Sequence, residues 1–218
     1  DEFFDFPFSS FFDISQLCRY CVKYDFDVVV TQMLDLFSEK SLSSLKKTGK
    51  ENIRQTYTSY DLGDVRREVY CDSDLVQRYG RRNIVTDSSL MLLFGGVRKR
   101  VYGLDCLLTK HSLFRMRTSV QLFTSAHFCN NANVADMTAV LYHYKLTSNA
   151  HSLALQNEVT FQQNSDGYKR FLEAIDSSPD KKLHTRTTRK LGSVDELVDL
   201  GFLVMSPQYR DYFEREKS

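Results

Sequence analysis

Apolar and polar positions between residues 84 and 161 change their spacing several times, and each change marks a predicted element. Ile84-Val85 and the apolar run Leu90–Phe94 predict two strands, and Gly95-Gly96 predicts a turn after them. A further short strand is expected to end at Val101-Tyr102, where Gly103 breaks it. The central region therefore begins with short strands joined by glycine turns.

The spacing then becomes helical and afterwards alternating. Apolar residues from Leu104 to Phe114 recur at near-helical spacing, which predicts a short amphipathic helix. From Arg117 to Phe128 the period is two, residues 130–133 predict a turn, and residues 134–147 predict a returning antiparallel strand. A last strand is predicted from Leu153 to Phe161.

This order of elements resembles the nuclear transport factor 2-like superfamily. The resemblance is carried by Ile84-Val85, by Leu90–Phe94 and above all by Val101–Leu108, where a strand would end in a glycine and a helix would begin. It covers about residues 63–161 and implies an α+β fold, with N-terminal helices packed on a strongly curved, cone-like antiparallel sheet. The family includes enzymes, ligand binders and scaffold subunits, so the resemblance implies a fold rather than an activity.

The flanking segments predict helices around this centre. An apolar stripe predicts a helix from about Asp25 to Leu45, and a second amphipathic segment spans residues 63–79. Near the C-terminus, residues 168–175 have helical spacing, Ser193 opens a capping box, and Ser206-Pro207 starts another helix. We expect an aromatic N-terminal extension (1–24), an α+β cone-like domain (25–176) and a C-terminal extension with two short helices (177–218).

Composition narrows the class of protein. The 218 residues carry 29 basic and 28 acidic side chains, so a net charge of +1 gives no global field for nucleic acid or an anionic membrane. A run of about 18 apolar residues is missing, which argues against a transmembrane segment. The five scattered cysteines do not suggest a disulfide framework, which favours a reducing intracellular compartment. The start at Asp1, without a methionine, fits a processed mature form and a trimmed sequence equally. On the first of these interpretations we expect a mitochondrial location.

Both ends of the chain are rich in aromatic residues. Six phenylalanines crowd an N-terminal arm, and each would bury about 150 to 250 Å². Two interpretations stay open: the arm folds back on its own domain, or it docks in the groove of a partner subunit. The candidate partner-binding residues are Phe3, Phe4, Phe6, Phe8, Phe11, Phe12, Tyr209, Tyr212 and Phe213.

Candidates for chemistry are few. His127, Asp136 and His143 fall on the two predicted strands beside the turn at 130–133, where His127 and Asp136 could form a general base with its orienting group. A surface hydrogen bond explains the same pair. Cys18 and Cys21 have the spacing of half a zinc site, but a second pair is missing and the two thiols can simply pack on a helix. Because cofactor-binding motifs are also missing, we expect no cofactor.

The first functional expectation is a non-catalytic scaffold or accessory subunit of a multiprotein complex, such as a respiratory or ATP-synthase assembly. The first alternative is a small-molecule enzyme or binder that uses the cone interior. The second is an RNA-associated, ribosomal subunit, for which the basic segments 98–100 and 181–190 are the candidates.

A scaffold predicts an interior filled by large side chains. The expected inward residues are Val120, Leu122, Phe128, Val140, Tyr142, Leu153 and Leu155. An open pocket of roughly 300 Å³ or more, lined by His127, Asp136 or His143, would instead favour the enzyme or binder.

Overall fold

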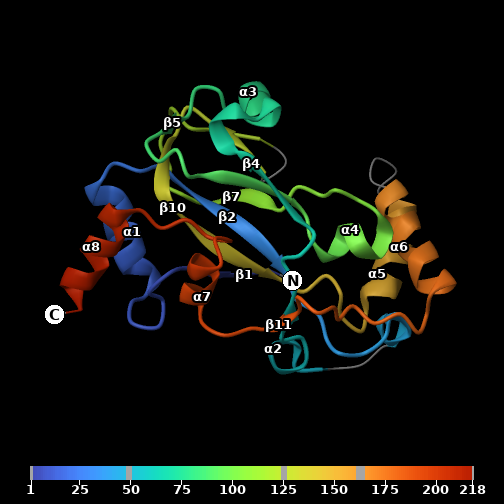
Figure 1. Ribbon diagram of the computed structural model, residues 1–218. Coiled ribbons are helices and arrows are strands. Elements are labelled where there is room, and N and C mark those ends of the chain that lie inside the picture. Colours follow the sequence, from blue (N-terminus) through green and yellow to red (C-terminus); the bar gives the residue numbers. More distant parts are fainter. Residues whose placement is uncertain (1, 48–50, 124–126, 161–164, 218) are drawn as a thin grey trace.

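The computed structural model describes residues 2–47, 51–123, 127–160 and 165–217, with the backbone alone at 158–160 and 165 (Figure 1). The strands are β1 (Glu2–Asp5), β2 (Val28–Asp35), β3 (Ser59–Tyr60), β4 (Val65–Val69), β5 (Ile84–Val85), β6 (Met91–Gly95), β7 (Thr109–Phe114), β8 (Gln121–Leu122), β9 (Cys129–Asn130), β10 (Asn133–His143) and β11 (Arg189–Lys190). The helices are α1 (Ile14–Lys23), α2 (Ile53–Thr56), α3 (Asp74–Tyr79), α4 (Val97–Tyr102), α5 (Ala150–Thr160), α6 (Ser165–Ser177), α7 (Val194–Asp199) and α8 (Pro207–Glu216). None of these helices is long and apolar enough to cross a bilayer.

The protein has an α+β fold built on one strongly curled sheet, as the sequence predicts. The strand order is β1-β10-β2-β7, and β5 also pairs with the start of β10. The prediction of an antiparallel sheet holds only in part: β1 with β10 and β2 with β7 are antiparallel, but β10 runs parallel to both β2 and β5. A parallel pair needs a long crossover connection, and the chain between β2 and β10 supplies one.

The central strand β2 occupies a segment in which we predicted a helix. All eight of its residues are buried, since β10 and β7 flank it and side chains pack on both of its faces. Its sequence begins with three valines and a threonine, which are β-branched residues that favour strands. A continuous apolar run satisfies helical spacing as easily as a strand does, and the β-branched residues decide between them.

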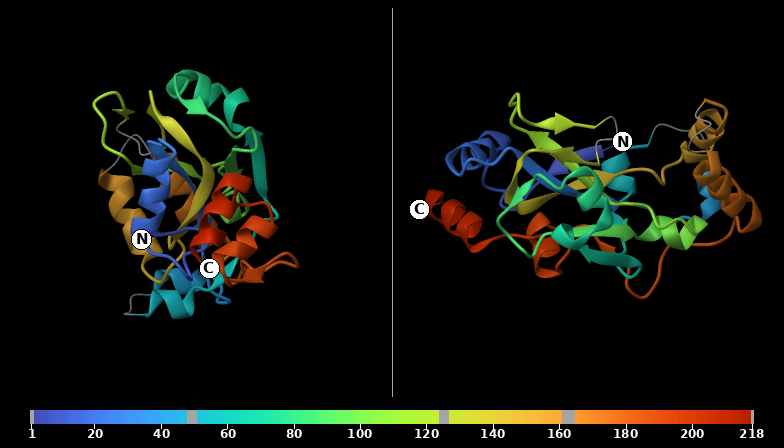
Figure 2. Two further views of the ribbon diagram at one scale, coloured as in Figure 1. Left: turned by 90° about the vertical axis from the view of Figure 1, so that its left-hand side faces the viewer. Right: turned by 90° about the horizontal axis from the view of Figure 1, so that it is seen from above.

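Helices gather at opposite ends of the sheet. In Figure 1, α1 and α8 lie together at the left and α4, α5 and α6 lie at the right, and the view from above in Figure 2 keeps the two groups apart. Helix α1 starts where Asp13 caps it and Gln16 completes a capping box. Its buried residues Leu17 and Tyr20 pack against Ala139 of β10. The right-hand group has a separate core around Phe171 of α6.

The aromatic arm folds back on its own domain, which is the first of the two interpretations. Strand β1 pairs antiparallel with β10, and Phe6 and Phe8 are buried. The C-terminal helix covers the arm: the ring of Phe8 stacks on Phe213 at 5.8 Å, and Tyr209 Oη donates to the carbonyl of Pro7 at 2.8 Å. The two aromatic ends therefore pack against each other, while Phe11 remains 65% exposed.

In the middle of the chain, helices form where strands were predicted and strands form where helices were predicted. Residues 97–102 form helix α4, which ends at Gly103 with a left-handed φ of 70°, and residues 109–114 form strand β7. The segment Val101–Leu108 thus runs from a helix end towards a strand, opposite to the order that carried the family resemblance. Most of the predicted helix at 63–79 is strand β4 and helix α3.

Two further predicted strands do not form as expected, and several other predicted elements do. The strand predicted at 117–128 contracts to β8, and residues 124–126 lie outside the described part. Helix α5 replaces the strand predicted from Leu153, and Phe161 also lies outside the described residues. The predictions of β6, α6, α7 and α8 are confirmed.

Candidate functional site

Two polar side chains meet where the parallel strands β2 and β10 end. Asp35 and His143 are the last residues of these strands and stand opposite each other in register. Both are buried, and His143 Nδ1 lies 2.6 Å from Asp35 Oδ1. From the first turn of α4, Arg98 Nε donates to the other carboxylate oxygen at 2.8 Å. Ligands commonly bind beyond the carboxyl ends of parallel strands, and this polar cluster occupies such a place.

The charges of this cluster depend on one another. Burial alone would raise the pKa of Asp35, but the positive charge of Arg98 and the hydrogen bond from His143 outweigh it and hold that pKa below its usual value. Burial alone would lower the pKa of Arg98, but the negative charge of Asp35 outweighs burial and holds the pKa of Arg98 above its usual value. Nη2 of Arg98 is buried without a hydrogen-bond partner in the part of the chain that the structure describes.

A pocket of about 570 Å³ opens beside this cluster. Its wall includes both predicted histidines, His127 and His143, together with Arg98. At its rim Lys110 Nζ contacts Glu2 Oε1 at 2.5 Å, which links the two edge strands β7 and β1. In a flat sheet those strands would lie about 14 Å apart, so the curl of the sheet helps the side chains to meet.

The pocket shows that the expected filled interior is wrong in part. Val140, Tyr142 and Phe128 are buried, as predicted. In contrast, Leu122 on a short outer hairpin and Leu153 and Leu155 on helix α5 are each about half exposed. These residues were assigned to inward-facing strands that do not form, so their side chains cannot fill the interior.

His127 is held in the pocket wall by backbone groups. Its Nδ1 lies 2.7 Å from the carbonyl oxygen of Thr109, and its own carbonyl lies 2.6 Å from Nδ1 of the buried His111. Burial lowers the pKa of both imidazoles, to about 4 for His111, so both are neutral at pH 7. His127 therefore offers the pocket a neutral, oriented ring.

Cys106 also lines the pocket, and its environment decides its chemistry. Burial is the main effect on this thiol and raises its pKa, although the nearby Arg98 acts in the opposite direction. Because the thiolate is the reactive form, Cys106 is a poor nucleophile at neutral pH. Acid–base chemistry by a histidine fits the site better than covalent chemistry by this cysteine.

Asp136 lies outside the site, and the predicted pairing with His127 does not form. Its carboxylate accepts hydrogen bonds from Tyr20 Oη at 2.7 Å and from Ser206 Oγ at 2.5 Å, which joins α1 and α8 to the sheet. Asp136 and His143 share strand β10, and at about 3.3 Å per residue they are separated by roughly 20 Å. The turn at 130–133 joins β9 to β10, but β9 pairs with β8 and not with β10, so this turn does not bring His127 opposite Asp136.

The two cysteines of the CxxC motif lie on helix α1, away from the pocket. Cys21 packs among the aromatic side chains, and burial raises its pKa to about 12, whereas Cys18 is exposed. Within the described ranges, the structure places no group of three or more His, Cys, Asp or Glu side chains where it could hold a metal ion.

Sequence reasoning missed Asp35, Arg98 and the ion pair of Glu2 with Lys110. The available signal was an aspartate that ends the apolar run of β2, a position where a charged residue is costly unless it has a partner. Comparisons with protein-family models, with curated proteins and with solved structures found no match to this chain.

Proposed function

We propose that the protein binds a small organic molecule in the pocket at the ends of β2 and β10, and that His143 acts on it as a general acid or base oriented by Asp35. The observation that carries this proposal is a pocket of about 570 Å³ whose wall includes His143 and Arg98, both held by the buried Asp35 behind them. The volume lies within the usual range for ligand sites, roughly 300 to 1,000 Å³.

The cost of the cluster supports a functional role. Removing two opposite charges from water is expensive, and apolar residues of similar size are often at least as stabilising. Buried charges beside a cavity are therefore candidates for binding or catalysis. Since Asp35 accepts from Nδ1 of His143, the ring holds its proton there and Nε2 is its basic nitrogen.

The lining indicates a polar ligand with an acidic group. Arg98, Lys110 and Lys145 bring positive charge to the wall, and Glu2 and Asp166 bring negative charge. The unpartnered Nη2 of Arg98 would gain an acceptor from a carboxylate or phosphate after a small shift of the side chain.

Alkylation of Cys106 tests the proposal without a prior guess of the ligand. Soluble metabolites are first screened for compounds that raise the melting temperature of the full chain. The reaction is run in alkaline buffer, where more of the Cys106 thiol is ionised. A true pocket ligand should slow the reaction of Cys106 with iodoacetamide, followed by mass spectrometry, and leave exposed Cys18 reacting as before. A screen in which every stabilising compound leaves both rates unchanged would contradict the proposal.

Catalysis is tested on the compounds that protect Cys106. His143→Gln should abolish any conversion of such a compound, because glutamine cannot exchange a proton near neutral pH. His151→Gln on α5 removes a histidine outside the pocket lining and should leave conversion unchanged. Equal rates in both variants would exclude His143 as the acid or base.

A structural subunit of a protein assembly is the second candidate, favoured by an exposed apolar stripe. The stripe consists of Phe11, Ile14, Cys18 and Val22, and the last three follow each other at helical spacing on the outer face of α1. An apolar hollow of about 190 Å³ between α1 and β7 continues it. Large exposed apolar patches commonly mark contacts with other proteins.

Co-purification tests this second candidate. The double change Ile14→Asp with Val22→Asp should release proteins that co-purify with the native chain, while Arg210→Asp on the outer face of α8 should retain them. Equal recovery with both variants would contradict docking through this stripe.

The cone-like family assignment also stays a proposal. It is supported by the strongly curled sheet and by the N-terminal helix α1 that packs on it. The parallel pairing of β10 with β2 departs from the family pattern implied by the sequence.

A further inference from the structure

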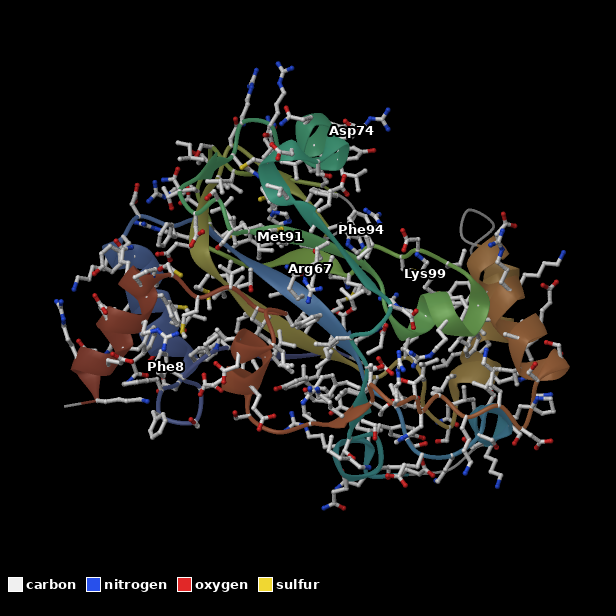
Figure 3. All side chains as sticks on the ribbon, in the orientation of Figure 1. Phe8, Arg67, Asp74, Met91, Phe94 and Lys99 are labelled. Atoms are coloured by element: carbon white, nitrogen blue, oxygen red, sulfur yellow. The ribbon has the colours of Figure 1, made fainter. Side chains whose placement is uncertain are left out.

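A second hollow, of about 530 Å³, lies on another side of the protein and shares no lining residue with the first pocket. Its charged side chains are Arg67 of β4, Arg186 from the loop before β11 and Arg189 of β11, and no carboxylate is among its described lining residues. Arg67 is labelled in Figure 3 near the middle of the view. We call this site the arginine hollow.

A buried aspartate holds the loop at 185–188, which carries Arg186 and leads to Arg189, through hydrogen bonds. Asp61, a buried residue, accepts hydrogen bonds from Oγ1 of Thr185, Thr187 and Thr188 at 2.5, 2.9 and 3.1 Å. Although burial opposes its charge, these contacts help to hold the pKa of Asp61 below its usual value, so it stays ionised. Residues 185–188 are therefore ordered by a permanent buried charge.

Two further contacts set the position of the segment. A Cβ on Gly63 would lie 2.9 Å from Thr187 Oγ1, so the loop before β4 and the threonine loop touch at a glycine. Arg189 then pairs with Tyr60 in the short β11–β3 sheet. Arg186 and Arg189 thus project from a segment tied at several points, which lowers the entropy cost of binding a ligand.

The charge of the hollow's arginines is not neutralised by ion pairs, unlike that of several arginines elsewhere. Arg66, Arg98, Arg100, Arg115 and Arg117 each form an ion pair with an acidic residue. Within the described residues, Arg67, Arg186 and Arg189 form none, and the one hydrogen bond of Arg67 is a long contact of 3.5 Å to the carbonyl of Gly201. Three arginines without an ion pair therefore share one hollow, while the buried Asp61 beneath the loop pairs with Arg100 at 3.2 Å.

The chemistry of guanidinium groups indicates which class of anion this hollow would bind. Their planar forks bind phosphate oxygens through two parallel hydrogen bonds, and several forks around one hollow suit an anion with more than one phosphoryl group. We propose that the arginine hollow binds a small ligand carrying a diphosphate or triphosphate. Leu62 and Leu200 add an apolar surface for an organic part of that ligand.

The surroundings favour a compact ligand over an extended nucleic acid. Of the basic residues assigned to RNA from the sequence, Arg98 and Lys99 pair with Asp35 and Asp105, and Lys190 pairs with Glu39. The hollow gathers three arginines without an ion pair around one space, which suits a compact anion better than an extended strand.

Calorimetric titration of the full chain with pyrophosphate, at low salt, tests the assignment. We expect one pyrophosphate per chain, with affinity that falls as salt is raised. The double variant Arg186→Gln with Arg189→Gln should weaken binding by roughly tenfold for each arginine removed. Arg66→Gln with Lys190→Gln removes the same charge from the surface outside the hollow and should change affinity by less than about twofold.

Three outcomes would overturn the assignment. The first is pyrophosphate that does not bind, or that binds equally weakly to both double variants. The second is a short oligouridylate that binds while pyrophosphate does not, since an extended strand would then be the ligand. The third is protection of Cys106 from iodoacetamide by pyrophosphate, which would place the anion in the other pocket.

Discussion

Replacing Asp35 by asparagine should destabilise the protein strongly. The change keeps the size of the side chain but leaves the Arg98 guanidinium, 2.8 Å away and largely buried, without its counter-charge. Breaking a buried ion pair by removing one partner costs about 3 to 5 kcal/mol. For a domain of this size that corresponds to a fall in melting temperature of roughly 6 to 20 °C.

Urea unfolding followed by far-UV circular dichroism measures this cost, since the chain has no tryptophan to report it by fluorescence. Asp176→Asn is the matched control: Asp176 also pairs with a cation, Lys46, but its side chain is 61% exposed. An exposed pair is worth about 0 to 1 kcal/mol. Adding Arg98→Met to Asp35→Asn should recover part of the loss, because the unpaired buried charge is then gone.

The dependence on pH has a defined sign. The pKa of Asp35 is lower in the folded protein than in the unfolded chain, so its contribution is present above the unfolded value of about 3.9 and is lost as pH falls through the folded value. The stability gap between wild type and Asp35→Asn should therefore be full at pH 7 and shrink below about pH 4. A loss at pH 7 no larger than that of Asp176→Asn would refute this account of the cluster.

Three further changes test other parts of the fold by the same urea assay. Phe8→Ala should cost about 3 to 5 kcal/mol, because the ring is buried beneath the C-terminal helix; a loss below about 1 kcal/mol would mean that the arm is not part of the core. Replacing Cys18 and Cys21 by alanine should cost about 1 kcal/mol, through Cys21 alone, and elemental analysis that finds stoichiometric zinc only in the wild type would contradict packing as their role. Gly95→Ala should cost at least about 1 kcal/mol, since φ is 85° and a Cβ would lie 2.7 Å from the carbonyl of Asp64; an unchanged midpoint would show that the turn can relax.

Local signals in the sequence predicted elements that carry their own start and stop. Ser193 caps α7 and Ser206 caps α8, each through its side chain, and the chain leaves α7 at Gly201 with a positive φ. Such signals act over a few residues, so they are readable without knowledge of the fold. The class α+β followed from the mixture of these helices with apolar strands.

Elements that depend on distant partners were misread. Residues 104–114 show apolar positions at nearly helical spacing, but the second half of the segment, β7, pairs with β2, which imposes a period of two there. The cluster at the ends of β2 and β10 could not be predicted for the same reason. Asp35 meets Arg98 and His143 only because three separate segments converge, and nothing within a few residues of any of them records the contact. His127 and His143 could be predicted because the chain has only five histidines, and each one is a candidate acid or base whatever the fold.

The packing of the two aromatic ends against each other delays the last step of folding until α8 has been synthesised. The hydrogen bond from Tyr209 to Pro7 closes a loop of 202 residues, and the stacking of Phe8 on Phe213 closes a slightly longer one. During synthesis the arm leaves the ribosome about 200 residues before its covering helix. At about 5 to 20 residues per second its phenylalanines wait for roughly 10 to 40 seconds without their partner. A nascent chain with such an arm is a natural substrate for chaperones that bind aromatic segments near the ribosome.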